Sequence, residues 1–313
     1  MRKLENFYVE TLNDNWGYFF RAEKKLFEKQ TSYQFLEVLE FPYFGRVLRL
    51  DGIFQTSYFD EMLYHEALAH VPGISLGGPK TALVIGGGDG GMIEELLKYN
   101  SLEKVVMVEL DKDVVDASKQ YLPAISNGAF EDPRLTLLFE DGVKYIKNTK
   151  EKFDQVILDL TDPFGPSVAL YTQEFYTSIA NILTERGCLS LHVESPLSRP
   201  DVYARLIATL KSVFQYVNPM FNYVPLYGTL WGYASASQMI HTTAISKDEV
   251  QKRINQLGLK NLRFYNQDTH FSLQAVPNYI EDLLKQKLPP YTEQDMIQLN
   301  DEISQKKLIL AEE

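Results

Sequence analysis

The feature that most constrains this chain is a glycine-rich turn with one acid inside it, GGGDGG at residues 86–91. The turn follows an apolar run at 81–85, which predicts a buried parallel strand, and precedes residues 92–99, which predict a helix. The glycines have the G-x-G-x-x-G spacing of a dinucleotide-binding turn, but Asp89 stands where a pyrophosphate would meet backbone N–H groups. A carboxylate there repels phosphate and attracts a cation. The turn therefore favours a positively charged ligand over a phosphate-bearing cofactor.

Strand and helix patterns alternate regularly from residue 80 onward. Strands are predicted at 81–85, 105–110, 135–139, 155–160 and 188–193. Helices are predicted between and after them, at 92–99, 112–121, 142–147, 173–183 and 201–213. Because parallel strands are joined by right-handed crossovers, this order predicts an α/β fold with a Rossmann-like, doubly wound sheet of the methyltransferase type.

The residues before this alternation predict a small N-terminal antiparallel β domain. Short strand-like runs are broken by turn signals, and Asp51-Gly52 is a strong hairpin signal. A helix is expected at 60–70, and Pro72-Gly73 is expected to begin a linker. The chain should therefore divide into an N-terminal β-strand domain at 1–75 and a Rossmann-like catalytic domain at 76–313.

The chain's polar C-terminal segment, residues 293–313, is expected to form a surface helix or to be partly disordered. No apolar run approaches the roughly 20 residues that span a bilayer, and the first residues show no signal-peptide pattern. We therefore expect a cytoplasmic location and no membrane partner.

Charge and composition exclude further classes. A formal net charge of −11 argues against a nucleic-acid surface. The single cysteine, Cys188, cannot form an internal disulfide and is expected to pack in the core. The five histidines show no metal-ligand spacing beyond a chance pair, His65 and His70, so no metal is expected.

Acids follow the carboxyl ends of the predicted strands, which is where open parallel sheets bind ligands. Glu109 lies 21 positions after Gly88, the distance at which a carboxylate accepts both ribose hydroxyls of an adenosine. Asp141 suits a hydrogen bond from an adenine amino group, or alternatively caps the helix that begins at Gly142. Together with the glycine-rich turn, these acids describe a nucleoside site with no provision for phosphate.

The fourth strand end carries the candidates for chemistry. Asp159 ends an apolar run, and Asp162 follows at a turn set by Pro163, although each acid alone could be a cap. Two carboxylates in one pocket raise each other's pKa unless a cation lies between them, which lets a site select an amine and take its proton. An alkylammonium has a pKa of roughly 10.4 and no free lone pair, so its alkylation needs a base. Asp159 is the expected base.

From about residue 16 to residue 284 the chain resembles the polyamine aminopropyltransferases, the spermidine synthase family. The resemblance rests on ordered, separated motifs, which include SYQ at 32–34, LDG at 50–52, YHE at 64–66, the turn at 86–91, VELD at 108–111, DPR at 132–134, DG at 141–142, DLTDPFGP at 159–166 and HVES at 192–195. It implies transfer of the aminopropyl group of decarboxylated S-adenosylmethionine to an amine, with release of 5'-methylthioadenosine. The donor is then a co-substrate, and no cofactor is needed.

The resemblance also implies a role for each motif residue. Asp159 and Tyr64 are expected to be catalytic. The donor and its methylthioadenosine part are expected to contact Gln34, Gln55, Gly86, Asp89, Glu109, Asp141, Gly142 and Pro166. The acceptor amine is expected to contact His65, Asp89, Asp159, Asp162 and Tyr227. Because decarboxylation leaves the aminopropyl arm cationic, Asp89 would bind its amine and disfavour ordinary S-adenosylmethionine through its carboxylate.

Some of these residues also have plain structural interpretations. Gln34 fits the polar face of an edge strand, and Tyr64 fits a core residue with a satisfied hydroxyl. His65 fits a helix-surface residue, and Pro166 fits the close of a turn.

Three departures from the family's common pattern concern the acceptor. D-L-T-D-P replaces D-S-S-D-P at 159–163, and residues 224–233 replace the usual I-P-T-Y-P-S-G segment. T-S-Y-F at 56–59 replaces the usual polar stretch before Asp60. The acceptor is therefore putrescine or a longer polyamine such as spermidine. The alternatives are an S-adenosylmethionine-dependent methyltransferase and a non-catalytic relative that binds nucleosides or polyamines. The expected partners are small-molecule polyamine and nucleoside substrates, and the expected assembly is a homodimer or homotetramer.

Overall fold

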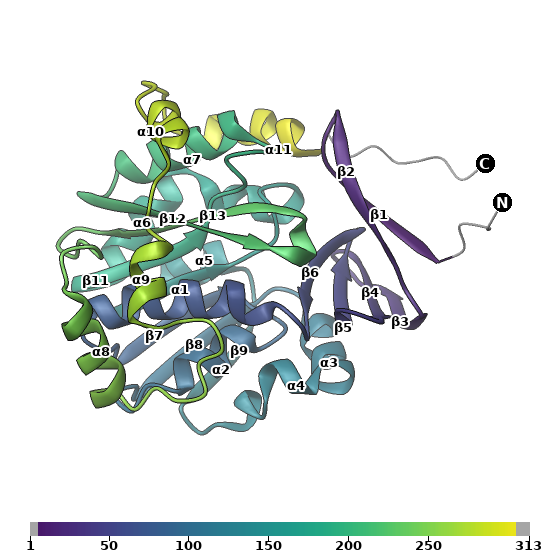
Figure 1. Cartoon of the computed structure of the whole chain (residues 1–313), viewed down its shortest axis with the longest axis horizontal. Helices are drawn as coiled ribbons and strands as arrows, with labels where there is room; N and C mark the ends of the chain where they lie inside the picture. The colour runs from purple at the N-terminus through teal and green to yellow at the C-terminus, as the bar shows by residue number, and fades with distance from the viewer. Residues whose placement is uncertain (1–5, 305–313) are drawn as a thin grey trace.

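The computed structural model describes residues 6–304 and shows a large α/β part beside a smaller all-β part (Figure 1). The large part is built on a seven-stranded sheet with the order β12-β13-β11-β10-β7-β8-β9. Its strands are β7 (Thr81–Gly86), β8 (Lys104–Glu109), β9 (Leu135–Phe139), β10 (Phe153–Asp159), β11 (Leu183–His192), β12 (Tyr216–Val224) and β13 (Thr229–Ser237). The five strands from β9 to β11 pair in parallel, whereas β13 is antiparallel to both of its neighbours. The expected α/β class is confirmed, and the β12–β13 hairpin is an addition that the sequence pattern did not predict.

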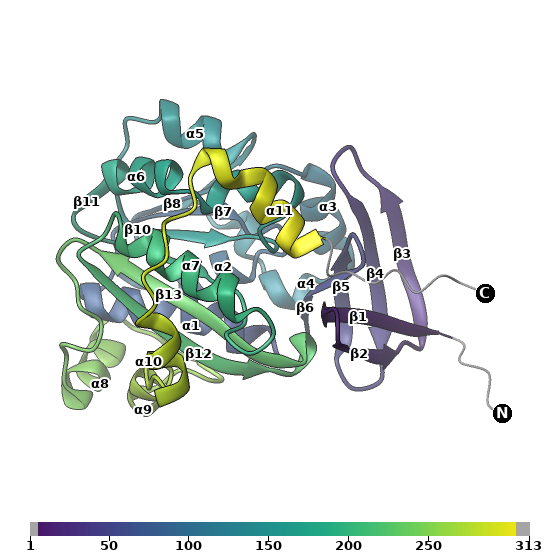
Figure 2. The same ribbon diagram turned by 90° about the horizontal axis from the view of Figure 1, so that it is seen from above.

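Helices cover both faces of this sheet because successive strand residues point to opposite sides (Figure 2). The helices are α1 (Glu61–Leu76), α2 (Gly91–Leu97), α3 (Lys112–Tyr121), α4 (Pro123–Ser126), α5 (Gly142–Asn148), α6 (Gln173–Ile182), α7 (Pro200–Lys211), α8 (Lys247–Gln256), α9 (Gln267–Ser272), α10 (Asn278–Leu284) and α11 (Met296–Ser304). Val84 and Met107 belong to a core shared with α1, α2 and α8. Leu83 and Val106, their neighbours in the strands, belong to a second core shared with α6 and α7.

The all-β part consists of a four-stranded antiparallel sheet and a separate two-stranded hairpin. The sheet contains β3 (Lys24–Gln30), β4 (Phe35–Phe41), β5 (Gly45–Leu50) and β6 (Ile53–Ser57), and the hairpin contains β1 (Phe7–Asn13) and β2 (Trp16–Arg21). Asp51 and Gly52 join β5 to β6 with φ angles of 47° and 80°, as a two-residue hairpin turn requires. Leu36 and Leu48 of the sheet pack against Val114 of α3, which fixes the small sheet at the edge of the large part.

Helix α1 corrects the prediction of a linker at Pro72-Gly73, because it continues through both residues to Leu76. Proline removes the N–H that would bond the carbonyl of Leu68. The Ser190 hydroxyl of β11 donates to that carbonyl at 2.9 Å, and Gln155 Nε2 of β10 donates to the neighbouring carbonyl of Ala69 at 2.9 Å. The sheet thus supplies side-chain donors where the helix is interrupted. Since α1 packs on β11 and α2, we propose a domain boundary before α1 rather than at residues 75 and 76.

The C-terminal segment is helical over the part that the structure describes. Leu299 and Ile303 of α11 are fully buried, so this helix packs on the molecule with one face, while residues 305–313 lie outside the described chain. Cys188 is buried in β11. Within residues 6–304, no helix has the length and apolar character needed to cross a membrane.

Candidate active site

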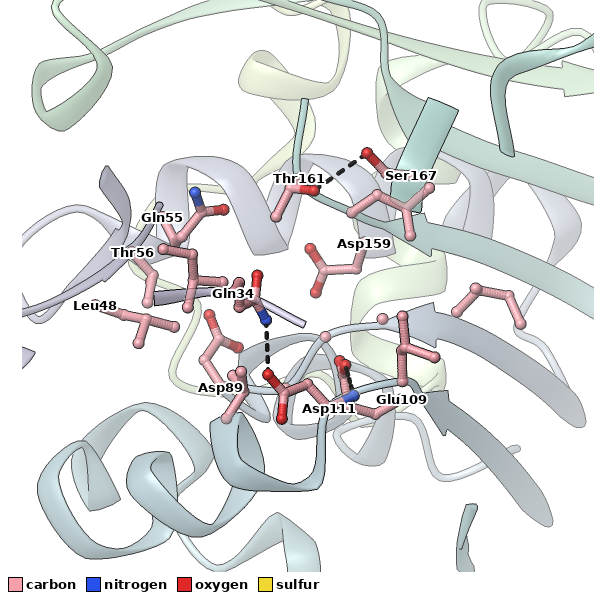
Figure 3. A pocket seen from close by; sticks show the side chains of 18 of the residues that line it. Gln34, Leu48, Gln55, Thr56, Asp89, Glu109, Asp111, Asp159, Thr161 and Ser167 are labelled. Atoms are coloured by element: carbon pink, nitrogen blue, oxygen red, sulfur yellow. Dashed lines mark hydrogen bonds between the residues drawn. The ribbon is translucent and has the colours of Figure 1, made fainter. Parts of the chain in front are cut away.

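A cavity of about 510 Å³ opens at the carboxyl ends of β7, β8, β9 and β10, with β5, β6, the turn before β4 and α1 also lining it (Figure 3). Apart from Asp162, every residue expected at the site lines this cavity: Gln34, Gln55, Tyr64, His65, Gly86, Asp89, Glu109, Asp141, Gly142, Asp159, Pro166 and Tyr227. Residues far apart in the sequence thus meet because the parallel strands end at one edge of the sheet.

The glycine-rich turn brings β7 into close contact with β10. Gly86 has a φ of 84°, and a Cβ on it would lie 2.1 Å from the carbonyl oxygen of Asp159. The next residue, Gly87, donates its N–H to the same carbonyl at 2.9 Å. A side chain at residue 86 would separate these strand ends, so the turn and Asp159 hold their positions together.

Asp89 lies inside the turn with its two oxygens in different roles. Oδ1 accepts the N–H of Gly91 at 2.8 Å, which closes the turn, and Oδ2 lies 3.6 Å from Nε2 of His65. The other ring nitrogen of His65 contacts Glu61 Oε2 at 2.9 Å. Burial lowers the pKa of His65, but the charges of Asp89 and Asp159 and the bond to Glu61 outweigh it and raise the pKa to about 10. The imidazole is therefore a cation at neutral pH.

Asp159 ends β10 with its carboxylate directed into the cavity (Figure 3). Its Oδ2 is buried and has no hydrogen-bond partner among the described residues. Burial raises the pKa of Asp159 to about 7, helped by the negative charge of Asp89 and opposed by His65 and a hydrogen bond from Tyr64. A carboxylate with this pKa can accept a proton near neutral pH.

Glu109 and Asp111 form the acidic end of β8. Glu109 is 9% exposed, and burial raises its pKa to about 7 even though Oε1 accepts the Asp111 N–H at 2.8 Å. Its Oε2 faces Gly88, where a Cβ would come within 3.1 Å of it. Asp111 Oδ2 accepts hydrogen bonds from Gln34 Nε2 at 3.1 Å and from the Thr31 hydroxyl at 2.7 Å. Asp111 was not among the expected site residues, although it belongs to the VELD motif.

Asp141 caps helix α5, as predicted by the structural alternative to an adenine contact. Oδ1 accepts the N–H groups of Val143 at 2.7 Å and of Lys144 at 3.1 Å. The residue is exposed at the cavity rim, and both cap bonds end on one oxygen. The cap therefore leaves the second carboxylate oxygen for a ligand contact.

Tyr64, Tyr227 and Gln55 line the cavity next to one another. The rings of Tyr64 and Tyr227 meet edge to face, with centroids 6.2 Å apart. The Tyr227 hydroxyl donates to the backbone carbonyl of Gln55 at 2.6 Å. This bond uses the only proton of the hydroxyl, so toward a ligand Tyr227 offers lone pairs, which suit an ammonium group.

Asp162 lies in a smaller adjoining cavity of about 30 Å³. Gln55, Tyr64, Leu160 and Tyr227 line both cavities, so the two are neighbours. The smaller one is also lined by residues that had no expected role: Glu10, His192, Glu194, Arg199 and Trp231. The HVES motif at 192–195 was the available signal for two of them.

Two groups of side chains are close enough to share a cation. Ligand atoms of His65, Asp89 and Asp159 lie within 4.8 Å of one another, as do those of Asp162, His192 and Glu194. The carboxylates of either group could bind an ammonium, whereas a metal ion in the first group would have to displace the proton of His65. The first group adjoins an acid-lined nucleoside pocket, so the arrangement suits a ligand with a nucleoside and a cationic arm. The expected absence of a metal stays a prediction.

Comparison with known proteins gives one consistent result. Residues 61–248 match the spermine/spermidine synthase domain, and residues 7–57 match the spermidine synthase tetramerisation domain. A polyamine aminopropyltransferase of Nitrosomonas europaea is 45% identical over 297 residues, which cover 95% of this chain and 91% of the relative. One from Saccharolobus solfataricus is 40% identical over 278 residues, 88% of this chain and 92% of the relative.

Solved structures agree with these sequence relatives. A spermidine synthase in complex with the transition state analogue AdoDATO has a TM-score of 0.84 at 33% identity, and the match covers 91% of this chain and 96% of that one. The spermidine synthase of Thermotoga maritima has a TM-score of 0.81 at 32% identity, over 91% of this chain and 95% of that one.

Proposed function

The chain belongs to the spermine/spermidine synthase family and is a polyamine aminopropyltransferase, and from this premise we propose which residues carry the reaction and which amines it accepts. The observation that carries the proposal is the meeting of His65, Asp89 and Asp159, with ligand atoms within 4.8 Å, beside a pocket that holds Glu109 and Asp141. The methyltransferase and non-catalytic alternatives are not favoured by the matches.

The donor, decarboxylated S-adenosylmethionine, is proposed to lie across the strand ends. Glu109 Oε2 accepts the ribose hydroxyls beside Gly88, and Asp141 and Gly142 contact the adenine at the rim. Gln34, Gly86, Gln55 and Pro166 complete the contacts to the thioadenosine. Asp89 then pairs with the ammonium of the aminopropyl arm, where the carboxylate of ordinary S-adenosylmethionine would be repelled.

Transfer is proposed to be a direct displacement with Asp159 as the base. The ammonium of the acceptor loses a proton to Asp159, and its nitrogen lone pair attacks the aminopropyl carbon next to the sulfonium. The carbon–sulfur bond breaks, its electron pair returns to sulfur, and neutral 5'-methylthioadenosine leaves. Tyr64 and Tyr227 hold the acceptor in line, and alignment of this kind contributes up to roughly 7–11 kcal/mol in favourable cases.

The acceptor is proposed to be putrescine or a longer polyamine such as spermidine, held by His65, Asp89, Asp159, Asp162 and Tyr227. The tetramerisation-domain match at residues 7–57 supports an oligomer, which we propose to be a homodimer or homotetramer. A cytoplasmic location remains an expectation from the sequence.

Incubation with decarboxylated S-adenosylmethionine and a panel of diamines and triamines tests the proposal. Mass spectrometry should detect an aminopropylated amine and an equal amount of methylthioadenosine for at least one acceptor. Methyl transfer from S-adenosylmethionine without any aminopropylated product would refute it.

A further inference from the structure

Arg263 contacts the active site from a part of the chain that lies outside the synthase-domain match. That match ends at residue 248, and Arg263 follows it in the loop between α8 and α9. Nη1 of Arg263 donates to Glu61 Oε1 at 3.1 Å, and Nη2 donates to the carbonyl oxygen of Phe59 at 3.2 Å. Glu61 begins α1 and lines the large cavity. A side chain of the C-terminal part thus holds a residue in the wall of the site.

Glu66 fixes the backbone from which Arg263 extends. Glu66 is fully buried in α1, and its side chain accepts three successive backbone N–H groups: those of Arg263 at 2.7 Å, Phe264 at 3.0 Å and Tyr265 at 2.6 Å. Three donors on one carboxyl group keep this stretch of the loop in place. Because Glu66 and Glu61 belong to the same helix, the loop and the residue that Arg263 contacts move as one unit.

His65 lies between Glu61 and the glycine-rich turn. Its Nδ1 is 2.9 Å from Glu61 Oε2, and its ring packs on Gly91, where a Cβ would come within 2.3 Å of Cε1. Nε2 lies 3.6 Å from Asp89 Oδ2. Carboxylate oxygens only accept hydrogen bonds, so both ring nitrogens direct a proton at an acid. The contact to Glu61 is the shorter one, so the proton on Nδ1 is held more firmly than the proton on Nε2.

The cationic substrates act on the less firmly held of these two protons. His65 is an imidazolium at neutral pH, with Glu61 at Nδ1 and with Asp89 and Asp159 as the other acids near its ring. The donor's sulfonium and ammonium oppose this charge when they bind beside Asp89. The hydrogen bond that one ring nitrogen makes decides which nitrogen of a neutral imidazole keeps the proton. Glu61 therefore favours loss of the proton from Nε2, the nitrogen that faces Asp89.

Resting on the proposed function, we infer that Glu61 is a positioning residue that keeps the Nδ1 proton of His65, so that Nε2 changes from donor to acceptor when the cationic substrates bind. Arg263 is a second positioning residue, because it holds Glu61 toward the imidazole. The Nε2 proton is released to solvent. The lone pair that it leaves accepts an N–H of a substrate ammonium, which an imidazolium would repel.

Nitrogen NMR of the enzyme with ¹⁵N-labelled histidine tests the role of Glu61, because the two ring nitrogens report which of them keeps the proton. His65→Gln identifies the signals of this histidine. In the donor complex without acceptor, titrated upward from pH 7, neutral His65 should keep its proton on Nδ1 in at least about 10-fold excess, the value of one hydrogen bond to a charged group. Glu61→Ala should lose this excess. A proton on Nε2 in wild type, or the same excess in Glu61→Ala, would overturn the inference.

Arg263→Gln tests the outer positioning residue at a half-exposed position, where folding does not depend on the side chain. A partly exposed ion pair predicts a fall of about 2- to 5-fold in kcat/KM for the acceptor. Arg263→Lys should recover most of it, since lysine can still pair with Glu61. In the Glu61→Ala background, Arg263→Gln should have no further effect. A fall of the same size in that background would show that Arg263 does not act through Glu61.

Arg253→Gln is the matched control. Arg253 also follows the synthase-domain match, pairs with a glutamate, Glu249, at 2.9 Å and donates to a carbonyl of α1, that of Ile74, at 2.8 Å, but it lines neither cavity. It should leave kcat/KM unchanged, and a fall equal to that of Arg263→Gln would count against a specific role of Arg263. If Glu61→Ala does not fold, Arg263→Gln should reduce the Nδ1 excess and Arg263→Lys should restore it, and an unchanged excess in Arg263→Gln would overturn the inference.

Failure of the proposed function would look different. In that case no amine is aminopropylated by the wild-type enzyme. The proton of His65 can still be followed in the enzyme without donor, titrated through the pKa of about 10. Neutral His65 with its proton on Nδ1 in wild type, and not in Glu61→Ala, would support the role of Glu61 independently of the reaction, and the opposite result would refute it.

Discussion

Oδ2 of Asp89 lies 3.6 Å from Nε2 of His65, so the acid that would bind the donor's amine also faces a cation of the protein itself. Oδ1 of the same carboxylate closes the glycine-rich turn through the N–H of Gly91. The two oxygens therefore separate the structural task of Asp89 from its proposed binding task, and a substitution can remove one without the other.

Asp89→Asn should weaken the donor and leave its product nearly unaffected. The amide oxygen of asparagine can still accept the Gly91 N–H, so the turn is kept, while the charge that faces the aminopropyl ammonium is lost. Loss of a charged hydrogen bond predicts a roughly 10- to 100-fold higher Kd for decarboxylated S-adenosylmethionine, and methylthioadenosine should change less than about 3-fold. Calorimetric titration of both ligands measures this. Equal losses would show that Asp89 does not contact the aminopropyl amine.

Donor binding should release protons at pH 7. The pKa of Asp159 is about 7 because burial favours the neutral acid, and the donor's two positive charges favour the carboxylate. The same charges lower the pKa of His65, which is about 10 without ligand. Titrations in two buffers of different ionisation enthalpy should report release of up to about half a proton from Asp159, together with any from His65. Methylthioadenosine, which lacks both charges, should release much less, and proton uptake with the donor would contradict the assigned charges.

Ser190 should stabilise the fold by bonding a carbonyl that Pro72 leaves without its helical partner. Ser190→Ala leaves the Leu68 carbonyl unpaired in the core, which predicts a loss of about 1–3 kcal/mol in the free energy of unfolding. Pro72→Ala restores a backbone N–H four residues after Leu68. It should therefore recover more stability in the Ser190→Ala background than in wild type. Denaturant midpoints of the four proteins measure this, and identical effects in both backgrounds would be the contrary result.

The parallel strands and the acids at their ends were predicted well from the sequence, because both depend on local patterns of residues. Strand β9 and helix α3 begin and end where expected, and the acids at 109, 141 and 159 meet because parallel strands end together. The course of α1 could not be predicted, since Pro72 normally interrupts a helix and its compensation by Ser190 is a tertiary contact. The β12–β13 hairpin was not predicted, because β13 has buried small residues on both faces and therefore shows no alternation of apolar and polar residues.

The acceptor side was predicted less completely than the donor side. Asp162 was expected to converge with Asp159, but the turn after β10 places it in a second cavity with Arg199. Arg199 comes from the start of α7 and Glu10 from the first hairpin, and no motif spacing connects either to Asp162. The hydrogen bond from Gln34 to Asp111 could not be predicted for the same reason, because it joins the all-β part of the chain to the α/β part.

The pH dependence of the activity should follow the ionisation of Asp159. The base must be ionised, so kcat/KM for the donor should fall as pH drops below the free-enzyme pKa of about 7. In the donor complex the sulfonium and ammonium lower that pKa, so the acid limb of kcat should lie at lower pH than that of kcat/KM. The profile of kcat/KM for the donor is measured with acceptor well below its KM, and that of kcat with both substrates saturating. Acid limbs at the same pH would show that the donor's charges do not reach the base.

The most direct measurement is the single-turnover rate of Asp159→Asn with donor already bound. General-base catalysis contributes typically 10²–10⁴-fold, so aminopropyl transfer should slow by about that factor, while methylthioadenosine binds within about 3-fold of wild type. Tyr99→Phe, at a buried tyrosine outside both cavities, serves as the control for a core substitution. Slow transfer with intact binding would establish Asp159 as the base of this aminopropyltransferase. Transfer at a near-normal rate would contradict that role.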